Sequence, residues 1–284
     1  MEKLRIAIQK NGRLSEKSLK LLADCGIRVN NGGKLKADAA NFPLEVLFLR
    51  DDDISQYVEE GVADVGMLGE NTVLEKDKNV EVVRKLGFAK CRLSLAVSKE
   101  VNYTGTSWFE GKKVATSYPQ ILGDYFKTKG VNATIEVISG SVEIAPGIGL
   151  AEGICDIVST GSTLLANGLK EVEQVLTSQA VRIANPNLSA EKQALLESIM
   201  FRMNAVQKAS ENKYILLNAP NAKLKEITAV LPGMKSPTIL PLAEEGWSSL
   251  HSVVKEDEFW EVIDKLKALG AEGILVCPIE KMIL

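Results

Sequence analysis

Apolar and polar positions alternate along the first two thirds of the chain in a rhythm that predicts strands followed by helices. Helical spacing of apolar residues appears between the apolar runs, for example at Leu19, Leu22 and Cys25, and Pro119 suits the first turn of a helix that Gly130 ends. Short apolar runs predict strands at 4–8, 44–49, 63–68, 92–97, 112–115, 134–138 and 154–158. This alternation indicates an α/β fold with parallel, doubly wound sheets, which bind ligands at the carboxyl ends of their strands.

Polar turns follow these predicted strands and fall into two groups. The first group carries charge and lies at 10–13, 50–53 and 69–71. The second carries hydroxyls and lies at 116–117, 139–141 and 160–163, with a further helix expected after 139. Three hydroxyl-bearing turns at one sheet edge favour an anionic ligand over simple helix capping.

Residues 154–169 contain the most informative of these turns. A β-branched strand, 154–158, breaks at Gly161 among hydroxyls and continues into a short helix that Asn167-Gly168 ends. Glycine lets backbone N–H groups approach a phosphate, and hydroxyls add donors. A Ser/Thr cap on an ordinary helix is the alternative interpretation. Asp156 at the mouth of the turn would repel phosphate, so it suits neutral sugar hydroxyls.

The order of the elements also predicts the domains. The extended segment 175–183 returns to the first sheet, which gives two α/β lobes facing a cleft: 1–91 with 175–211, and 92–174. A helix over 189–211, capped by Ser189, connects to a third unit, 212–284. Its βαββαβ order is the ferredoxin-like arrangement, with one sheet face free and no obvious catalytic cluster.

Composition narrows the chemistry. The 284 residues include 34 basic and 37 acidic side chains, a net charge of −3, so nucleic-acid binding has little support. No apolar run reaches the ~20 residues of a membrane span and no signal-peptide core opens the chain, so we expect a cytoplasmic protein. Four scattered cysteines show neither zinc nor disulfide spacing. With a single histidine, His251, the chemistry must come from carboxylates, cations, hydroxyls and backbone amides.

The turns resemble the signatures of the ATP phosphoribosyltransferases that open histidine biosynthesis. The segment 154–169 resembles that family's phosphoribosyl-pyrophosphate loop, and further matches cover essentially the whole chain in the same order. These are 9–13, 50–53, 69–71, 116–119, 140–143, 237–242 and 278–282, the last two typical of the family's long form. The resemblance implies two α/β lobes of the periplasmic-binding-protein type that form a catalytic cleft, plus a C-terminal ferredoxin-like regulatory domain.

The resemblance also implies a reaction and its partners. The adenine N1 of ATP attacks the anomeric carbon of phosphoribosyl pyrophosphate, which releases pyrophosphate and gives phosphoribosyl-ATP. Mg²⁺ is expected on the substrate phosphates, because it is a hard ion held mostly by phosphate oxygens and water. Histidine and AMP are the implied inhibitors, with histidine near Thr238 and Ala271, and a dimer-to-hexamer equilibrium is the implied assembly.

Site residues carry over by position. Ser159, Thr160, Gly161, Ser162 and Thr163 would hold the 5′-phosphate. Asp156 and Glu143 are the catalytic candidates on the ribose face, although Glu143 also suits a helix start. Lys10 and Arg13 are further candidates for phosphoribosyl pyrophosphate. The candidates for ATP are Arg13, Arg50, Asp51, Glu70, Asn71 and Tyr118.

A purely structural role remains an alternative to a functional one at several of these positions. Asp52 and Asp53 suit a helix start, and any single Lys or Arg is by default a solvated surface charge. Tyr118 either stacks on adenine or is a buried aromatic beside Pro119. At the level of function, a two-lobed solute-binding or effector-sensing protein is the alternative, as is a phosphoribosyltransferase acting on another base.

Overall fold

The computed structural model describes residues 2–30, 32–231 and 233–283. Met1 and Leu284, the outer limits of the predicted domains, therefore lie outside the described residues. The chain groups into two compact units. One comprises Met1–Lys20 and Ile27–Gln193, and the other comprises Leu21–Gly26 and Ala194–Leu284. The prediction placed the start of the last domain at residue 212, whereas the second unit already takes in most of the preceding helix.

The first lobe is built on a six-stranded sheet of order β2-β3-β1-β4-β11-β5. The central strands β3, β1 and β4 are parallel, whereas β2, β5 and β11 pair antiparallel, so the sheet is mixed rather than parallel as predicted. Its elements are β1 (Leu4–Gln9), α1 (Arg13–Asp24), β2 (Lys36–Asp38), β3 (Leu44–Leu49), α2 (Asp51–Glu59), β4 (Val65–Gly69), α3 (Glu70–Lys76), β5 (Glu81–Lys85) and β11 (Ala180–Ala184). The edge strands β2 and β5 were not predicted, because each is short and carries charged residues instead of an apolar run.

The second lobe is built on a five-stranded sheet of order β10-β6-β9-β7-β8, also mixed. Its elements are β6 (Cys91–Ser98), η1 (Thr106–Phe109), β7 (Lys113–Thr116), α4 (Pro119–Lys129), β8 (Thr134–Val137), η2 (Val142–Ile144), β9 (Gly153–Val158), α5 (Ser162–Ala166) and β10 (Leu169–Ser178). The helix expected after residue 139 is only the single 3₁₀ turn η2. Pro146, Gly147 and Gly149 follow it, and these residues do not support a longer helix.

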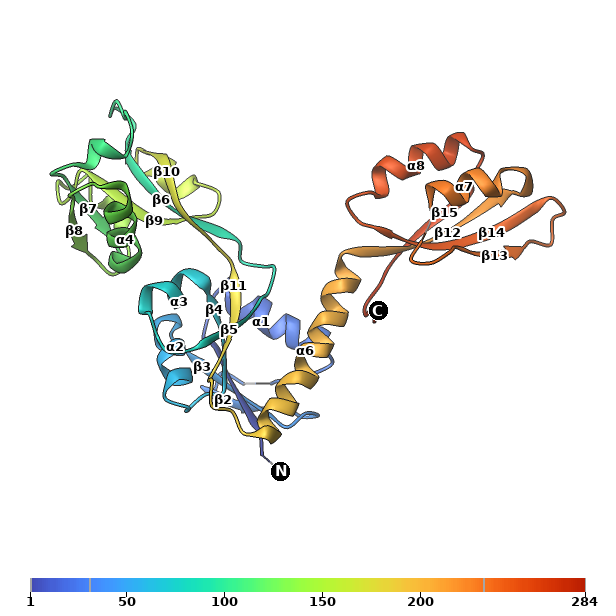
Figure 1. The fold of residues 1–284 in the computed structure, drawn as a ribbon, viewed down its shortest axis with the longest axis horizontal. Helices are drawn as coiled ribbons and strands as arrows, with labels where there is room; N and C mark the ends of the chain where they lie inside the picture. The colour runs from blue at the N-terminus through green and yellow to red at the C-terminus, as the bar shows by residue number, and fades with distance from the viewer. Residues whose placement is uncertain (1, 31, 232, 284) are drawn as a thin grey trace. The chain divides into compact units, whose positions relative to one another are not determined.

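Two segments carry the chain between the lobes, β5 to β6 and β10 to β11 (Figure 1). The predicted return to the first sheet at residue 175 is too early. β10 stays paired with β6 as far as Ser178, which lies opposite Cys91, and β11 begins at Ala180. The alternation of apolar and polar residues could not show where the chain passes from the second sheet to the first, because β10 and β11 are both extended and follow each other with a single residue between them.

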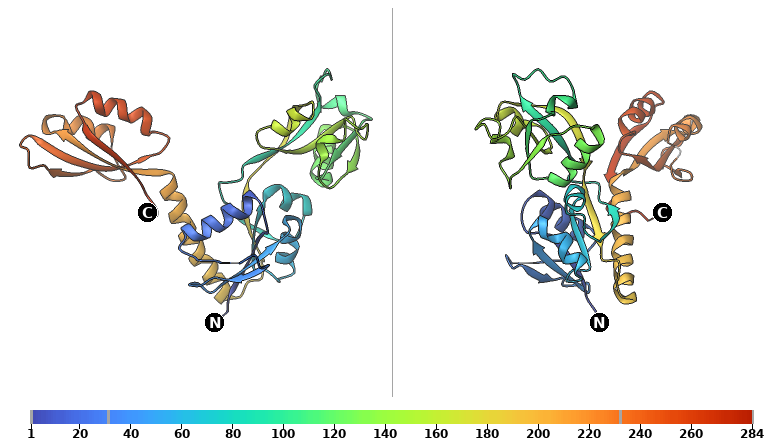
Figure 2. Two further views of the ribbon diagram at one scale, coloured as in Figure 1. Left: turned by 180° about the vertical axis from the view of Figure 1, so that it is seen from behind. Right: turned by 60° about the vertical axis from the view of Figure 1, so that its left-hand side comes forward.

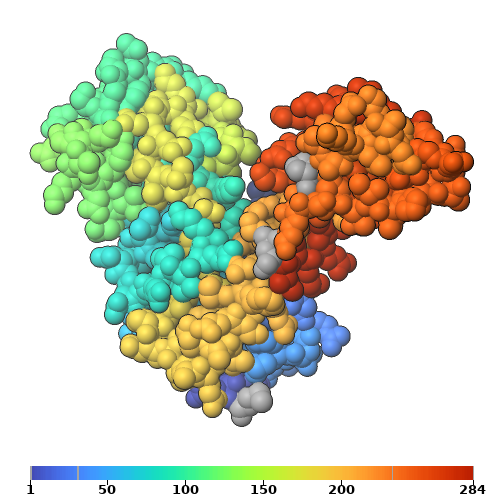
Figure 3. Space-filling view, turned by 45° about the vertical axis from the view of Figure 1, so that its right-hand side comes forward, coloured from blue at the N-terminus to red at the C-terminus, as the bar shows by residue number. Residues whose placement is uncertain are grey.

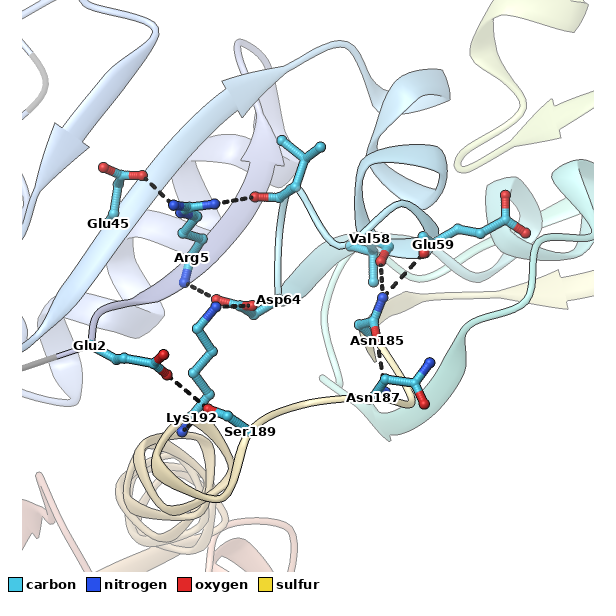
Figure 4. Close-up of polar contacts among 11 residues, drawn as sticks. Glu2, Arg5, Glu45, Val58, Glu59, Asp64, Asn185, Asn187, Ser189 and Lys192 are labelled. Carbon is cyan, nitrogen blue, oxygen red and sulfur yellow. Dashed lines mark hydrogen bonds and ion pairs between the residues drawn. The ribbon is translucent and has the colours of Figure 1, made fainter.

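Polar contacts fix the chain where it leaves β11 for the long helix α6 (Ala190–Ser210) (Figure 4). The buried carboxylate of Asp64 accepts the Arg5 amide at 2.7 Å and Lys192 Nζ at 2.8 Å. The Asn185 side-chain amide donates to the carbonyl of Val58 at 2.7 Å. Ser189 Oγ accepts the amide of Lys192, which confirms the predicted helix cap.

The C-terminal domain contains β12 (Asn212–Pro220), η3 (Asn221–Lys223), α7 (Leu224–Val230), β13 (Thr238–Pro241), β14 (Trp247–Lys255), α8 (Phe259–Ala268) and β15 (Glu272–Pro278). The sheet order β13-β14-β12-β15, with every pair antiparallel, confirms the ferredoxin-like prediction. Both α7 and α8 cover one face of this sheet (Figure 2), where Leu217, Leu250 and Leu266 form its core. The other face presents Tyr214 and Leu275, which is 58% exposed. In the described ranges, no helix is both long and apolar enough to cross a membrane.

Candidate functional site

A pocket of about 480 Å³ lies at the carboxyl ends of strands from both lobes. The first lobe contributes the start of α2 and part of α3. The second contributes the β7–α4 turn and the segment after β8. Figure 3 shows one face of the lobes as filled atoms, the first from blue to teal and the second from green to yellow. The lining residues are Asp51, Asp52, Thr72, Glu75, Lys76, Ser117, Tyr118, Pro119, Val137, Ile138, Ser139 and Gly140. This is the location that open α/β sheets predict for a ligand.

Tyr118 brings several predicted residues together at this pocket. Its hydroxyl accepts a hydrogen bond from Asn71 Nδ2 at 3.1 Å, a contact between the two lobes. Burial raises the pKa of its phenol well above the ordinary value, and the negative charges of Asp156 and Asp51 raise it further. The hydroxyl therefore stays protonated and can donate. Tyr118 lines the pocket while half-buried, so both interpretations of its role stay open.

Three consecutive aspartates, 51–53, open α2, and Asp51 is the one whose side chain turns inward. Its carboxylate accepts Thr72 Oγ1 at 2.8 Å, and burial raises its pKa, with a further rise from neighbouring Asp52. Asp52 pairs with Lys76 at 3.3 Å on the surface. Arg50 is exposed at the N-cap position of α2. The sequence did not distinguish the three aspartates by burial; the structure does.

The predicted phosphate loop is open to solvent. Gly161 is the N-cap of α5, with φ of +82°, and has no side chain that could cap this helix. The Ser/Thr-cap interpretation stays open, because Thr160 Oγ1 accepts the amide of Ser162, the first residue of α5, at 3.5 Å. Thr160 and Ser162 hold each other through their hydroxyls at 3.0 Å. Ser159, Thr160, Ser162 and Thr163 are exposed, so an anion can reach them.

Two carboxylates lie beside this loop. Asp156, half-buried on β9, accepts the amide of Ile157 at 2.8 Å. Burial raises the pKa of Asp156, and the negative charge of Glu143 raises it further. The two carboxylates are therefore close enough for the charge of one to act on the other. Such a pair suits a cationic or metal-bound partner better than a bare anion.

The remaining predicted residues are either exposed to solvent or already bonded to other side chains. Lys10 and Arg13 are exposed at the turn between β1 and α1. Glu70 forms an ion pair with Lys85 at 2.9 Å, and Asn71 accepts Ser178 Oγ at 2.7 Å. Glu70 is therefore already engaged inside the first lobe.

The hydroxyls expected at 116–117 both make hydrogen bonds inside the second lobe. Thr116 is fully buried, donates to the Cys155 carbonyl at 2.7 Å and accepts the Tyr118 amide at 2.9 Å. Ser117 donates to the carbonyl of Ile138 at 2.7 Å. These hydroxyls shape the turn. Thr116 is closed off from any ligand, whereas Ser117 lines the pocket, so its contact with an anion stays a prediction.

Sequence reasoning missed Glu75. Its carboxylate accepts the amides of Gln120 at 3.0 Å and Ile121 at 3.1 Å, so a side chain of α3 in the first lobe caps α4 in the second. The sequence carried a weak signal. Pro119 opens α4 without a local capping side chain, which leaves helix-end amides that need an acceptor.

The predicted histidine-binding residues lie on opposite edges of the C-terminal sheet. Thr238 is exposed on β13, whereas Ala271 is buried just before β15. Two strands, β14 and β12, separate them, a span of roughly 14 Å at the usual strand spacing. His251, on the open face, contacts Tyr214 Oη at 2.7 Å and Ser249 Oγ at 3.1 Å.

The fold and the site define a class of protein. Two α/β lobes meet at a polar pocket, with an exposed glycine loop nearby, which are the features of a two-lobed α/β protein that binds an anionic ligand. The chain belongs to the ATP phosphoribosyltransferase family. The model of that family matches residues 50–205, and the model described as "HisG, C-terminal domain" matches residues 209–281.

Relatives extend this match over almost the full length. An ATP phosphoribosyltransferase from Cytophaga hutchinsonii is 60% identical over 99% of this chain and 98% of its own. Another from Bacteroides thetaiotaomicron is 60% identical over 99% of each. A solved Thermotoga maritima structure, an ATP phosphoribosyl transferase (HisG:HisZ) complex, is 28% identical with a TM-score of 0.62, covering 71% of this chain and 96% of that one.

Proposed function

We propose that this chain transfers the phosphoribosyl group of phosphoribosyl pyrophosphate to N1 of ATP, the first step of histidine biosynthesis. A bond forms between N1 and the anomeric carbon, and the bond to pyrophosphate breaks with its electron pair leaving on pyrophosphate. The exposed loop at Gly161 beside Asp156 carries the proposal, on a chain that belongs to the family along nearly its full length. A cytoplasmic setting belongs to the same proposal.

The two lobes divide the work. Residues 159–163 hold the 5′-phosphate through backbone amides and hydroxyls, while Asp156 and Glu143 face the ribose. Positive charge develops on the sugar ring as pyrophosphate leaves, and two nearby carboxylates stabilise it. The pocket lined by Asp51 and Tyr118 receives the nucleotide, and Lys76 is a cation in its lining. Lys10, Arg13 and Arg50, which are exposed and do not line this pocket, stay candidates for the substrate phosphates. Catalysis here depends on placement and electrostatics more than on a proton shuttle.

Mg²⁺ fits the residues present. Among the described residues no group of three His, Cys, Asp or Glu side chains could hold a metal alone. Mg²⁺ would therefore be held mainly by substrate phosphate oxygens and water, with the carboxylates of Asp156 and Glu143 as the protein ligands that we propose. When bound, the ion neutralises the leaving pyrophosphate.

Regulation is proposed for the C-terminal domain. Histidine bound by both Thr238 and Ala271 cannot bridge the sheet of one copy, because two strands intervene. Two copies lying edge to edge could bring the two residues together, which ties inhibition by histidine to assembly from dimer to hexamer. AMP competes at the nucleotide pocket.

The test is an assay with ATP, Mg²⁺ and phosphoribosyl pyrophosphate, followed by pyrophosphate release. Release of pyrophosphate that requires ATP, and that does not occur when guanine or another base is supplied in place of ATP, supports the proposal. Tight binding of a small solute without release would favour the solute-binding alternative, and release with another base would favour a different phosphoribosyltransferase.

A further inference from the structure

The phosphate loop begins where strand β9 ends, beside the first residues of β6. Arg92 lies on β6 directly opposite Val158, the last residue of β9. Its guanidinium Nη1 donates to the carbonyl of Ser159 at 3.2 Å. A side chain of a neighbouring strand therefore holds the backbone at the first residue of the loop.

Glu171 on β10 fixes the arginine in turn. Its two carboxylate oxygens accept Nε and Nη2 of Arg92, a two-pronged contact. Ser94 Oγ donates to the same carboxylate at 2.8 Å. Ser94 is fully buried and is the cross-strand partner of Asp156. Because alternate residues share a sheet face, the contact lies on the face that carries Asp156.

The geometry differs from that of an ordinary surface ion pair. Isolated exposed pairs contribute little, but a two-pronged arginine contact adds directional specificity. The two side chains are 32% and 28% exposed, and hydrogen bonds between them raise the pKa of Arg92 and lower that of Glu171. With its charge already matched by Glu171, the guanidinium is placed to hold a carbonyl rather than a substrate phosphate.

We infer that Arg92 and Glu171 act as a positioning pair for the phosphate loop: Glu171 orients Arg92, and Arg92 holds the Ser159 carbonyl, so that the loop is preformed for the 5′-phosphate. This rests on the proposed function. Loss of Arg92 releases the loop and also leaves the Glu171 carboxylate with Ser94 but without its cation, on the sheet face that carries Asp156, where its charge opposes binding of an anionic substrate. Lysine has no planar fork and cannot make the three contacts together.

The experiment is steady-state kinetics of the full-length enzyme with each substrate varied. Arg92→Gln and Arg92→Lys are expected to raise KM for phosphoribosyl pyrophosphate about tenfold, the loss of a hydrogen bond to a charged group. KM for ATP should stay within about twofold, because the ATP pocket is untouched. Glu171→Gln should show the same split more weakly, and Arg92→Gln combined with Glu171→Gln should not add the two effects.

Lys113→Gln is the matched control, since it removes a half-exposed ion pair with Glu136 on the same sheet away from the loop. Both KM values should match those of the parent. If Arg92→Gln does not fold, Glu171→Gln, which keeps the shape of the side chain, carries the test. Equal rises of both KM values, or no rise for phosphoribosyl pyrophosphate, overturn the positioning role.

Thr163→Ala separates the two claims. If it weakens phosphoribosyl pyrophosphate binding while the Arg92 and Glu171 variants do not, the loop assignment stands and the positioning pair is wrong. If none of the variants affects that substrate, the loop itself is misassigned.

Discussion

Gly161 is the residue on which the phosphate loop depends. Its φ of +82° lies in the left-handed region that other residues avoid, and the nearest atom to an added Cβ, on Val158, is 3.9 Å away. The constraint is therefore backbone conformation and not crowding. Gly161 itself supplies no capping side chain, and the one side-chain acceptor at this helix start, Thr160 Oγ1, is a long 3.5 Å from the amide of Ser162.

Gly161→Ala tests this conformation. We expect the free energy of unfolding to fall by about 1 kcal/mol and the affinity for phosphoribosyl pyrophosphate to fall with it. Gly111→Ala is the matched control, because Gly111 has φ of +70°, open space around it and a position in another turn. Denaturant unfolding should show similar losses for both variants. Equal substrate affinity in both variants would contradict the assignment.

The carboxylate of Glu173 makes the folding stability of the second lobe depend on pH in acid. Burial raises its pKa, but hydrogen bonds from Tyr103, Tyr125 and Thr106 outweigh it and bring the value from 4.5 to about 2. A lowered pKa means that this carboxylate contributes stability above pH 4.5 and that the contribution is lost as pH falls from 4.5 towards 2.

Glu173→Gln should therefore flatten the pH dependence of unfolding in that window. The variant is less stable than the parent at neutral pH, and the gap closes as the pH approaches 2. Urea unfolding midpoints measured from pH 7 to 2 check this. Parallel curves for parent and variant across the window would show that Glu173 is not the group responsible.

At the scale of elements, proline and glycine residues predicted the helix ends, which depend on local backbone chemistry. Pro119 and Gly130 defined α4, which runs Pro119–Lys129 with Gly130 as its left-handed cap, as predicted. The short edge strands β2 and β5, the single turn of η2 and the late switch at Gln179 were missed. Each of these depends on pairing or on a following proline or glycine rather than on an apolar repeat.

The candidate site likewise contains some residues that the sequence could identify and others that it could not. Asp156, Asp51, Asn71 and Tyr118 could be found from the sequence because they sit at strand ends or helix starts, and the structure brings them to one region. The buried orientation of Thr116, the ion pair that engages Glu70 and the cap supplied by Glu75 could not be found. They arise from contacts between segments 15 to 46 residues apart.

Glu75 offers a test at this scale. Glu75→Gln keeps the shape of the side chain but removes the charge that faces the start of α4, so the free energy of unfolding should fall by about 1 kcal/mol. Asp124→Asn, one turn further along the same helix, should change it by less than about 0.5 kcal/mol. Thermal denaturation compares the two. A cost for Asp124→Asn equal to that of Glu75→Gln would mean that the cap contributes nothing specific.

At the scale of the whole molecule, the C-terminal sheet ends in two open edges. β13 is exposed along its length, with Leu240 50% exposed, and β15 is largely exposed. Such edges pair readily with another chain. The sequence predicted the ferredoxin-like order, but the distance between Thr238 and Ala271 became evident only from the strand order.

If histidine drives assembly through edge pairing, as proposed, Leu240→Lys should weaken that assembly, because a charge on an exposed edge opposes pairing with another strand. Activity without histidine should be unchanged. Trp260→Lys is the control, an exposed apolar residue of α8 on the helical side. Light scattering with and without histidine gives the mass. Unaltered histidine-driven assembly in Leu240→Lys would argue against edge pairing.

The central claim is that residues 159–163 hold the phosphate of phosphoribosyl pyrophosphate. Calorimetric titration of this substrate, with Mg²⁺, into the parent and Thr163→Ala tests it most directly. The account predicts affinity weakened about tenfold in the variant, the loss of a hydrogen bond to a charged group, with an unchanged unfolding midpoint. Equal affinity in the two proteins would contradict it.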